Sequence, residues 1–95
     1  MTILSLSQIA DSFDLTEDDL RQQALMSFLK DKRREALRLR LEILSDYGVS
    51  DALELETKIT TGAVAEHPAW ENLIVVENLN FRLQEIDDHL QKLSG

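Results

Sequence analysis

The sequence predicts a mainly α-helical protein, in which two long helices form an antiparallel hairpin with a short helix between them. Only one Pro and three Gly occur among the 95 residues, so long stretches carry no helix breaker. Apolar residues recur every three or four positions over residues 16–46 and 68–93, and a helix-start signal opens each segment. We therefore expect a single helical domain over residues 1–95.

Residues 1–15 are expected to form an N-terminal arm. Residues 1–8 alternate loosely between apolar and hydroxyl side chains, which is typical of a short strand or an extended arm. So short a strand is not stable alone, and it would pair most simply with a second copy of itself. Residues 7–14 can form one or two helical turns, with Ile9, Ala10 and Phe13 on one side.

The first long helix is expected over residues 16–46. Thr16 supplies a hydroxyl that can accept a bond from the free amides of the first turn, and acidic residues 17–19 suit the positive end of the helix dipole. A helix over residues 17–45 of this segment would span roughly 43 Å. A compact domain of about 100 residues has a radius of gyration near 13 Å. We therefore expect an elongated hairpin, a break in the helix, or an oligomer that covers its ends.

The apolar pattern of this helix is interrupted at residues 30–35, which contain no apolar side chain. A continuous core-facing stripe would place one there. In the interpretation that we favour, Lys32 or Arg33 lays its aliphatic stem over the apolar stripe. In the alternative, two structural units meet here, an N-terminal unit ending at Leu29 and a C-terminal hairpin beginning at Ala36.

The connection between the long helices is predicted to contain a short helix over residues 50–61. Gly48 can adopt the left-handed conformation that ends the first long helix. Asp51 has Glu54 three positions later, which is the spacing of a capping box. Pro68 suits the first position of the second long helix, predicted over residues 68–93, because no amide bond is lost there.

The second long helix keeps its apolar residues to one face, as in a helix packed along its length on another. A lone hairpin cannot bury both sides of stripes this wide, so we predict a homodimer with a four-helix arrangement. Trp70 is either a core anchor that pins the connection or an interface anchor. The residues predicted to form the dimer or partner interface are Trp70, Leu73, Val76, Leu83, Ile86 and Leu90.

Charge is unevenly spread along the chain. Its net charge is −8, yet residues 30–40 carry six basic side chains against two acidic ones. We favour a solvated helix surface whose charges offset the acidic remainder, and the alternative is a site for an acidic protein partner. The acidic balance of the chain argues against nucleic acid. This basic patch consists of Lys30, Lys32, Arg33, Arg34, Arg38 and Arg40.

The sequence shows no residue set for catalysis, cofactor binding or metal ligation. The absence of Cys excludes disulfides, thiolate zinc sites and a Cys nucleophile. His67 and His89 lack the acid three positions earlier that metal sites in helical bundles use. The carboxylates of Glu85, Asp87 and Asp88 have no predicted pocket and are expected to be exposed. We expect neither an enzyme nor a bound cofactor.

Membrane contact and secretion are not expected. The longest uninterrupted apolar run, Leu73–Val76, is far short of the roughly 18 residues that a membrane span needs. No Lys or Arg precedes Arg21 to form the basic start of a secretory signal. We expect a cytoplasmic protein of a bacterium or an archaeon.

The segment Leu15–Leu25, LTEDDLRQQAL, resembles the second helix of ribbon-helix-helix regulators. That family also begins with a short strand and a brief first helix, places that Thr2–Leu6 and Gln8–Phe13 would take here. The resemblance implies strand-mediated dimerisation rather than DNA binding, because this strand is largely apolar and has no base-reading set. More loosely, the chain is similar to small, acidic, mostly helical prokaryotic proteins that act as antitoxin partners.

The function predicted from the sequence is a non-enzymatic protein-interaction module that self-associates through helix faces. The alternative is an antitoxin-like or transcription-linked regulator that binds a protein partner through residues 1–40. The alternative predicts a neighbouring toxin-like gene, whereas the first interpretation requires only a second copy of the chain.

Overall fold

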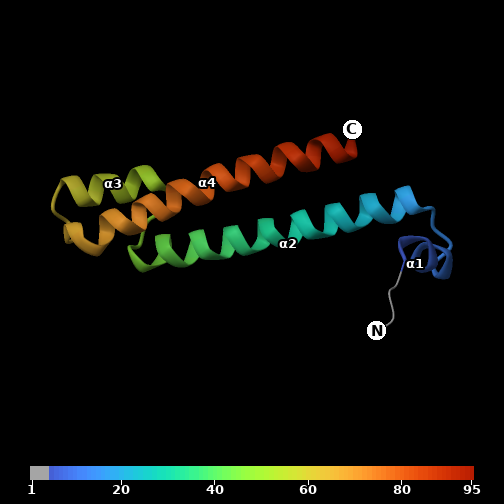
Figure 1. The fold of residues 1–95 in the computed structure, drawn as a ribbon. Helices are drawn as coiled ribbons and strands as arrows, with labels where there is room; N and C mark the ends of the chain where they lie inside the picture. Colours follow the sequence, from blue (N-terminus) through green and yellow to red (C-terminus); the bar gives the residue numbers. More distant parts are fainter. Residues whose placement is uncertain (1–4) are drawn as a thin grey trace.

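The computed structural model describes residues 5–95, which form four helices and, within that range, no strand. The helices are α1 (Leu6–Ser12), α2 (Glu17–Asp46), α3 (Ala52–Thr60) and α4 (Glu66–Ser94). The long helices α2 and α4 lie side by side and antiparallel (Figure 1). At one end of this hairpin α3 packs on α4, and at the other α1 folds back beside the start of α2. The mainly helical fold predicted from the sequence is confirmed.

The first helix begins at a capping box that sequence reasoning did not identify. The Ser5 hydroxyl accepts a hydrogen bond from the Gln8 amide at 3.1 Å, and the Gln8 side chain accepts one from the Ser5 amide at 3.2 Å. This pairing favours a helical first turn over extended backbone. Residues 6–8 are therefore helical rather than part of the short strand or extended arm predicted over residues 1–8, and residues 1–4 lie outside the described residues.

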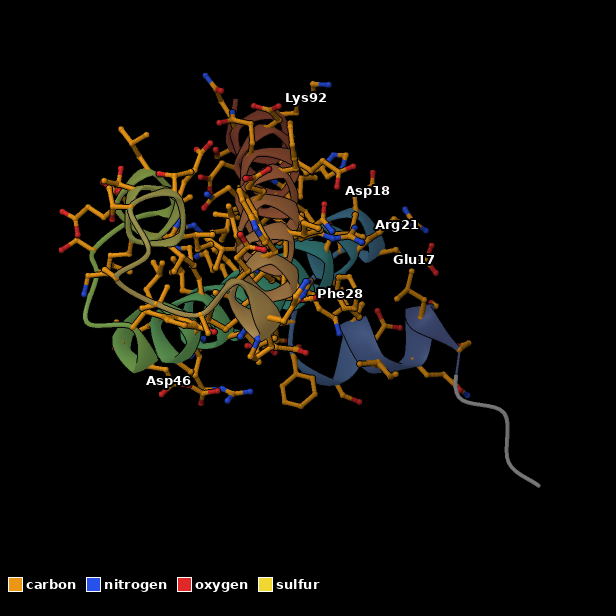
Figure 2. All side chains as sticks on the ribbon, turned by 90° about the vertical axis from the view of Figure 1, so that its left-hand side faces the viewer. Glu17, Asp18, Arg21, Phe28, Asp46 and Lys92 are labelled. Carbon is orange, nitrogen blue, oxygen red and sulfur yellow. The ribbon has the colours of Figure 1, made fainter. Side chains whose placement is uncertain are left out.

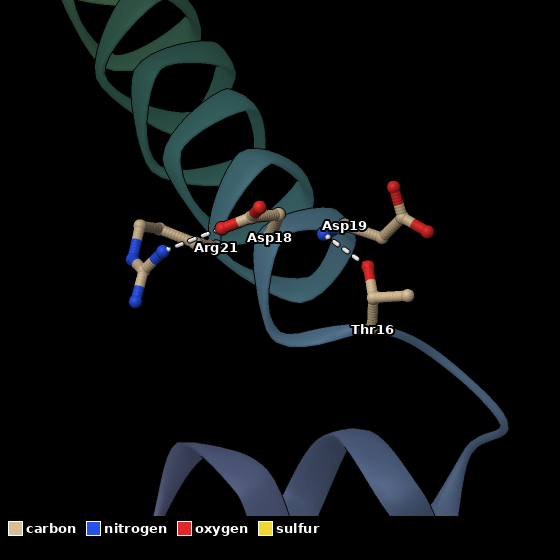
Figure 3. A network of polar contacts seen from close by, with 4 residues as sticks. All are labelled: Thr16, Asp18, Asp19 and Arg21. Carbon is tan, nitrogen blue, oxygen red and sulfur yellow. Dashed lines mark hydrogen bonds and ion pairs between the residues drawn. The ribbon is translucent and has the colours of Figure 1, made fainter.

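Helix α2 begins where the sequence predicts. The Thr16 hydroxyl accepts a hydrogen bond from the Asp19 amide at 3.0 Å, and Arg21 pairs with Asp18 at 2.9 Å (Figure 3). The helix then continues without interruption for 30 residues to Asp46. The interpretation in which two structural units meet at residues 30–35 is therefore wrong.

Arg33 explains how α2 crosses the stretch that has no apolar side chain. Its side chain is partly buried, and its Nε donates to the Asp87 carboxylate of α4 at 2.8 Å. The aliphatic stem thus reaches across the line of contact between α2 and α4, which we call the seam, while the charged group meets an acid at its edge. The interpretation that a basic stem covers the seam is confirmed for Arg33.

The turn between α2 and α3 is built from local capping. Gly48 adopts φ 64°, the left-handed conformation, and the Val49 amide donates to the Leu44 carbonyl at 3.0 Å. The Asp51 carboxylate accepts from the Glu54 amide at 2.8 Å, which starts α3 as predicted. These bonds reverse the chain so that α3 lies against α4.

The best-buried core lies at this end of the hairpin, where α3 provides a third helix. Its centre is formed by Leu55 and Ile59 of α3 with Ala69 and Leu73 of α4. We call this region the closed end. The partly buried side chains packed around the centre are Tyr47, Val49, Ala52, Val64 and Trp70.

The molecule is elongated and thin. Its radius of gyration is 19.5 Å and its principal extents are 60 × 35 × 16 Å. A compact chain of this length has a radius of gyration of about 12 Å. The long helices therefore form an extended hairpin rather than a compact bundle.

Candidate functional site

A groove follows one side of the hairpin, between α2 and α4. Figure 2 looks along the hairpin from the closed end and shows Phe28 to the right of α4, whereas α3 lies to its left. The third helix therefore leaves this side open. We call its surface the groove face, which is lined by Phe28, Leu29, Lys32, Glu35, Ala36 and Leu39 of α2 and by Leu79, Arg82, Glu85, Ile86 and His89 of α4.

Helical periodicity explains why these residues meet. On α2 the positions of Phe28, Lys32 and Leu39 differ by four and seven, so they lie on one side of the helix. On α4, Leu79 and Ile86 differ by seven and likewise share a side. Because the two helices are antiparallel neighbours, these sides form one continuous surface.

The groove face is open and largely apolar. Ala36 and Ile86 form its buried floor, but the Phe28 residue is 58 % exposed and Leu39 is 37 % exposed. The stripe of α2 continues with Leu25, which is also exposed. A contiguous apolar surface bordered by charged residues is typical of a protein interaction site, unlike single exposed apolar residues.

The charged rim of the groove is balanced. On α2, Lys32 pairs with Glu35 at 3.6 Å, and on α4, Arg82 pairs with Glu85 at 3.5 Å. The Lys32 ammonium also lies over the Phe28 ring, 5.6 Å from its centre. Two cations thus face two carboxylates on a chain whose net charge is −8. The rim carries none of the acidic excess of the rest of the molecule.

The residues predicted to form the dimer interface lie mainly inside the chain. Leu73, Val76, Leu83 and Ile86 are buried by the other helices of the same chain. Of this group Ile86 lines the groove, as its floor. Trp70 packs against the core of the closed end, as its interpretation as a core anchor predicts. An interface formed by this whole set stays a prediction, and it would require the hairpin to open.

The six residues of the basic patch do not share one face. Arg33 and Arg40 turn toward α4, where they contact Asp87 at 2.8 Å and Asn80 at 2.7 Å. Lys32 lines the groove. The remaining pairs join Arg34 with Asp31 and, at 2.7 Å, Arg38 with Glu42, all on α2. This pairing fits the interpretation of a surface whose charges are offset by neighbours, and a partner site at this patch stays a prediction.

The histidines and carboxylates form no metal-binding cluster in the part of the chain that the structure describes. His67 Nδ1 lies 2.8 Å from Glu71 Oε1, four residues later and across a kink at His67 and Pro68 where the backbone is not helical. Hydrogen bonds from its own backbone amide and from the His67 ring lower the pKa of Glu71. His89 instead borders the groove.

Sequence reasoning missed the groove as a site. On α4 its residues alternate between apolar and charged types, as in Leu79, Arg82, Glu85 and Ile86, so no purely apolar stripe marks it. The usable signal was the combined spacing of apolar and long charged side chains, since Lys and Arg stems can continue an apolar face.

Comparisons with known proteins give one positive finding. The family model described as the Uncharacterized protein MJ0235 family matches residues 1–95. No curated protein and no solved structure matches the chain. These findings leave the antitoxin-like and ribbon-helix-helix interpretations as predictions. Between residues 5 and 95, none of the helices combines the length and the apolar content that crossing a bilayer requires.

Proposed function

The chain belongs to the MJ0235 family, and on that premise we propose that it is a self-associating protein-interaction module. Two copies bury their groove faces against each other and complete a four-helix arrangement. The protein does no chemistry in this proposal. Its function is to present the assembled bundle.

The surface area of the single chain carries the proposal. The chain exposes 7055 Å². A compact monomer of 10.9 kDa would expose only about 5,600 Å². The excess is about 1,500 Å², whereas a stable protein interface buries about 800 Å² on each partner. The chain as a whole therefore exposes more surplus surface than one partner buries in a full interface.

The composition of that surface also suits burial. Phe28, Leu39 and Leu79 supply apolar area, and the rim carries equal numbers of cations and carboxylates. An apolar centre with a polar border is the usual anatomy of a protein interface. Phe28 stands out because its ring is more than half exposed, although burying such a ring stabilises by roughly 1.5–3 kcal/mol.

The test compares Phe28→Glu with Phe81→Glu. Both residues are exposed phenylalanines, but Phe28 lines the groove and Phe81, which is 75 % exposed, does not. Light scattering behind size-exclusion chromatography should give about twice 10.9 kDa for the wild type and for Phe81→Glu at micromolar concentration. Phe28→Glu places two charges in the dimer centre and should raise the dissociation constant at least about 100-fold.

Circular dichroism of each variant checks that the helices remain folded. A wild-type chain that stays monomeric at about 100 µM, roughly 100 times a micromolar dissociation constant, would overturn the proposal. A dimer that Phe28→Glu and Phe81→Glu weaken equally would also overturn it, because the groove face would then not be the interface.

A further inference from the structure

Resting on the proposed function, we infer that the two copies recognise each other by a charge code on the groove rim. In this arrangement α2 of one copy lies antiparallel on α2 of the partner copy. In the same way, α4 of one copy lies antiparallel on α4 of the partner copy. Lys32 of each copy pairs with Glu35 of the other, and Arg82 of each pairs with Glu85 of the other.

The contacts across the hairpin show which residues lie at the same height along it. Arg33 meets Asp87 and Arg40 meets Asn80. Because the helices are antiparallel, moving two residues forward from Arg33 along α2 corresponds to moving two residues back from Asp87 along α4. Glu35 therefore lies level with Glu85 on the groove face. Lys32 then lies on one side of this level and Arg82 on the other, each about 4.5 Å away along the helix axis.

A twofold axis parallel to the hairpin would place α2 of one copy over α4 of the other and keep every residue at its own height. Glu35 would then meet Glu85 of the partner copy, and the same contact would recur on the other side of the axis. Like charges brought together at an interface oppose association. This arrangement is therefore disfavoured by the rim itself.

A twofold axis across the hairpin reverses the direction of the partner, so that each helix meets its own copy. Both long helices carry the cation first and the carboxylate three residues later, so reversal sets each cation opposite a carboxylate. The midpoint between Lys32 and Glu35 along α2 is also the midpoint between Phe28 and Leu39. The register that pairs the charges therefore also packs Phe28 on Leu39 of the partner copy.

The midpoint of the charge pair on α4 is displaced from that on α2 by about 4.5 Å along the hairpin. Because the two helices of a hairpin lie about 8–10 Å apart, absorbing this offset requires the two hairpins to cross at roughly 50°, which is the commonest class of helix crossing in globular proteins. The balanced rim also favours a second copy over a strongly acidic or basic partner, which would leave half of these four charges against like charge.

The first test separates the charges into two variants. The acid-rim variant carries Lys32→Glu and Arg82→Glu, and the base-rim variant carries Glu35→Lys and Glu85→Lys. Each alone should dimerise at least about 100-fold more weakly than the wild type, because every pair becomes repulsive. An equimolar mixture should form a heterodimer within about 10-fold of the wild-type affinity.

The matched control for the acid-rim variant is Arg34→Glu with Arg38→Glu, which makes the same change in net charge on α2 outside the groove. It should dimerise nearly as the wild type does. If it weakens the dimer as much as the acid-rim variant, net charge rather than the rim code governs association and the inference fails.

The second test measures the register. The chain has no Cys, so a spin label at Gln23→Cys, an exposed position on α2, is unique in each copy. With the axis across the hairpin, the two labels lie roughly 30 Å apart along the axis. With the axis parallel to it, they lie at one height and only the bundle width separates them. Pulsed electron resonance distinguishes these distances.

The outcomes separate the inference from the proposed function. A monomeric wild type overturns both. A wild-type dimer that depends on Phe28, but whose rim variants do not pair or whose labels lie at one height, overturns the charge code alone. A heterodimer in the mixture together with the longer label distance supports it.

Discussion

The two ends of the hairpin bury their apolar side chains in different ways. At the closed end, α3 covers one side of α4, and Leu55 and Ala69 are 0 % exposed. The open end contains the start of α2 and the end of α4, and there α1 packs on α2 but, within residues 5–95, no third helix packs on α4. There the contacts across the seam include polar ones, such as Arg33 with Asp87 and Gln22 with the Leu93 carbonyl at 2.7 Å.

This difference shows what a third helix contributes. A helix pair buries one stripe on each member, and the flanks of both stripes remain in contact with water. Where α3 is present, one flank becomes core. Where it is absent, Phe28 stays 58 % exposed and an arginine takes a position in the seam. The closed end thus forms a core within one chain, although exposed apolar side chains remain at both ends, such as Phe28 at the open end and Phe81 at the closed end.

The largest expected effect is at the closed end. Leu55→Ala removes a fully buried side chain from the core between α3 and α4 and should reduce the free energy of unfolding by about 2–5 kcal/mol. Urea unfolding at one fixed protein concentration measures it, since dimerisation would make stability depend on concentration.

Leu53→Ala provides the matched control on the same helix. Leu53 is 70 % exposed, so its truncation should change stability by no more than about 0.5 kcal/mol. Equal losses for the two variants would mean that α3 does not close a core at this end, and the contrast between the ends would disappear.

The next effect tests how Arg33 serves the open end. Arg33→Ala removes both the ion pair and the stem over the seam and should cost about 1 kcal/mol. Arg33→Met keeps an apolar stem and should cost less than about 0.5 kcal/mol, because a partly exposed ion pair contributes little. Urea unfolding at the same protein concentration measures both variants.

Arg34→Ala serves as the exposed control, because the Arg34 side chain is 77 % exposed and pairs only with Asp31 of its own helix. If Arg33→Met is as costly as Arg33→Ala, the ion pair with Asp87 rather than the stem stabilises the seam, and the physical account of the open end changes.

The helix caps show how far the sequence predicts the structure. Thr16 and Asp51 were identifiable as caps because a cap bonds to amides two or three residues away, within the printed sequence. The same local logic applied to Ser5 and Gln8, but the loose alternation of residues 1–8 indicated a short strand or an extended arm there. For residues 6–8 the cap was the better guide than the periodicity.

Long-range choices were less accessible. The stripe of Leu73, Val76 and Leu83 was recognised as the associating face of α4, but the sequence does not say whether it meets another helix of the same chain. In the structure, that stripe packs on α2 and α3 of the same chain. The groove face depends on which side α3 covers, and this is decided by the turn at Gly48 and by packing rather than by the composition of α4.

The smallest expected effect is at the exposed surface of the closed end and depends on pH. The pKa of Glu71 is lowered by hydrogen bonds from its own backbone amide and from the His67 ring. Because the folded-state pKa lies below the unfolded one, the ionised carboxylate stabilises the fold above the unfolded pKa, and this contribution is lost as pH falls through the folded pKa.

Glu71→Gln should therefore lower Tm slightly at pH 5–7, and its difference from the wild type should shrink below about pH 4. Thermal melts followed by circular dichroism measure this, with Glu77→Gln, an exposed glutamate on the same helix, as the control. A Glu71→Gln difference that persists unchanged to acid pH would show that the shape of the side chain, rather than its charge, matters at the start of α4.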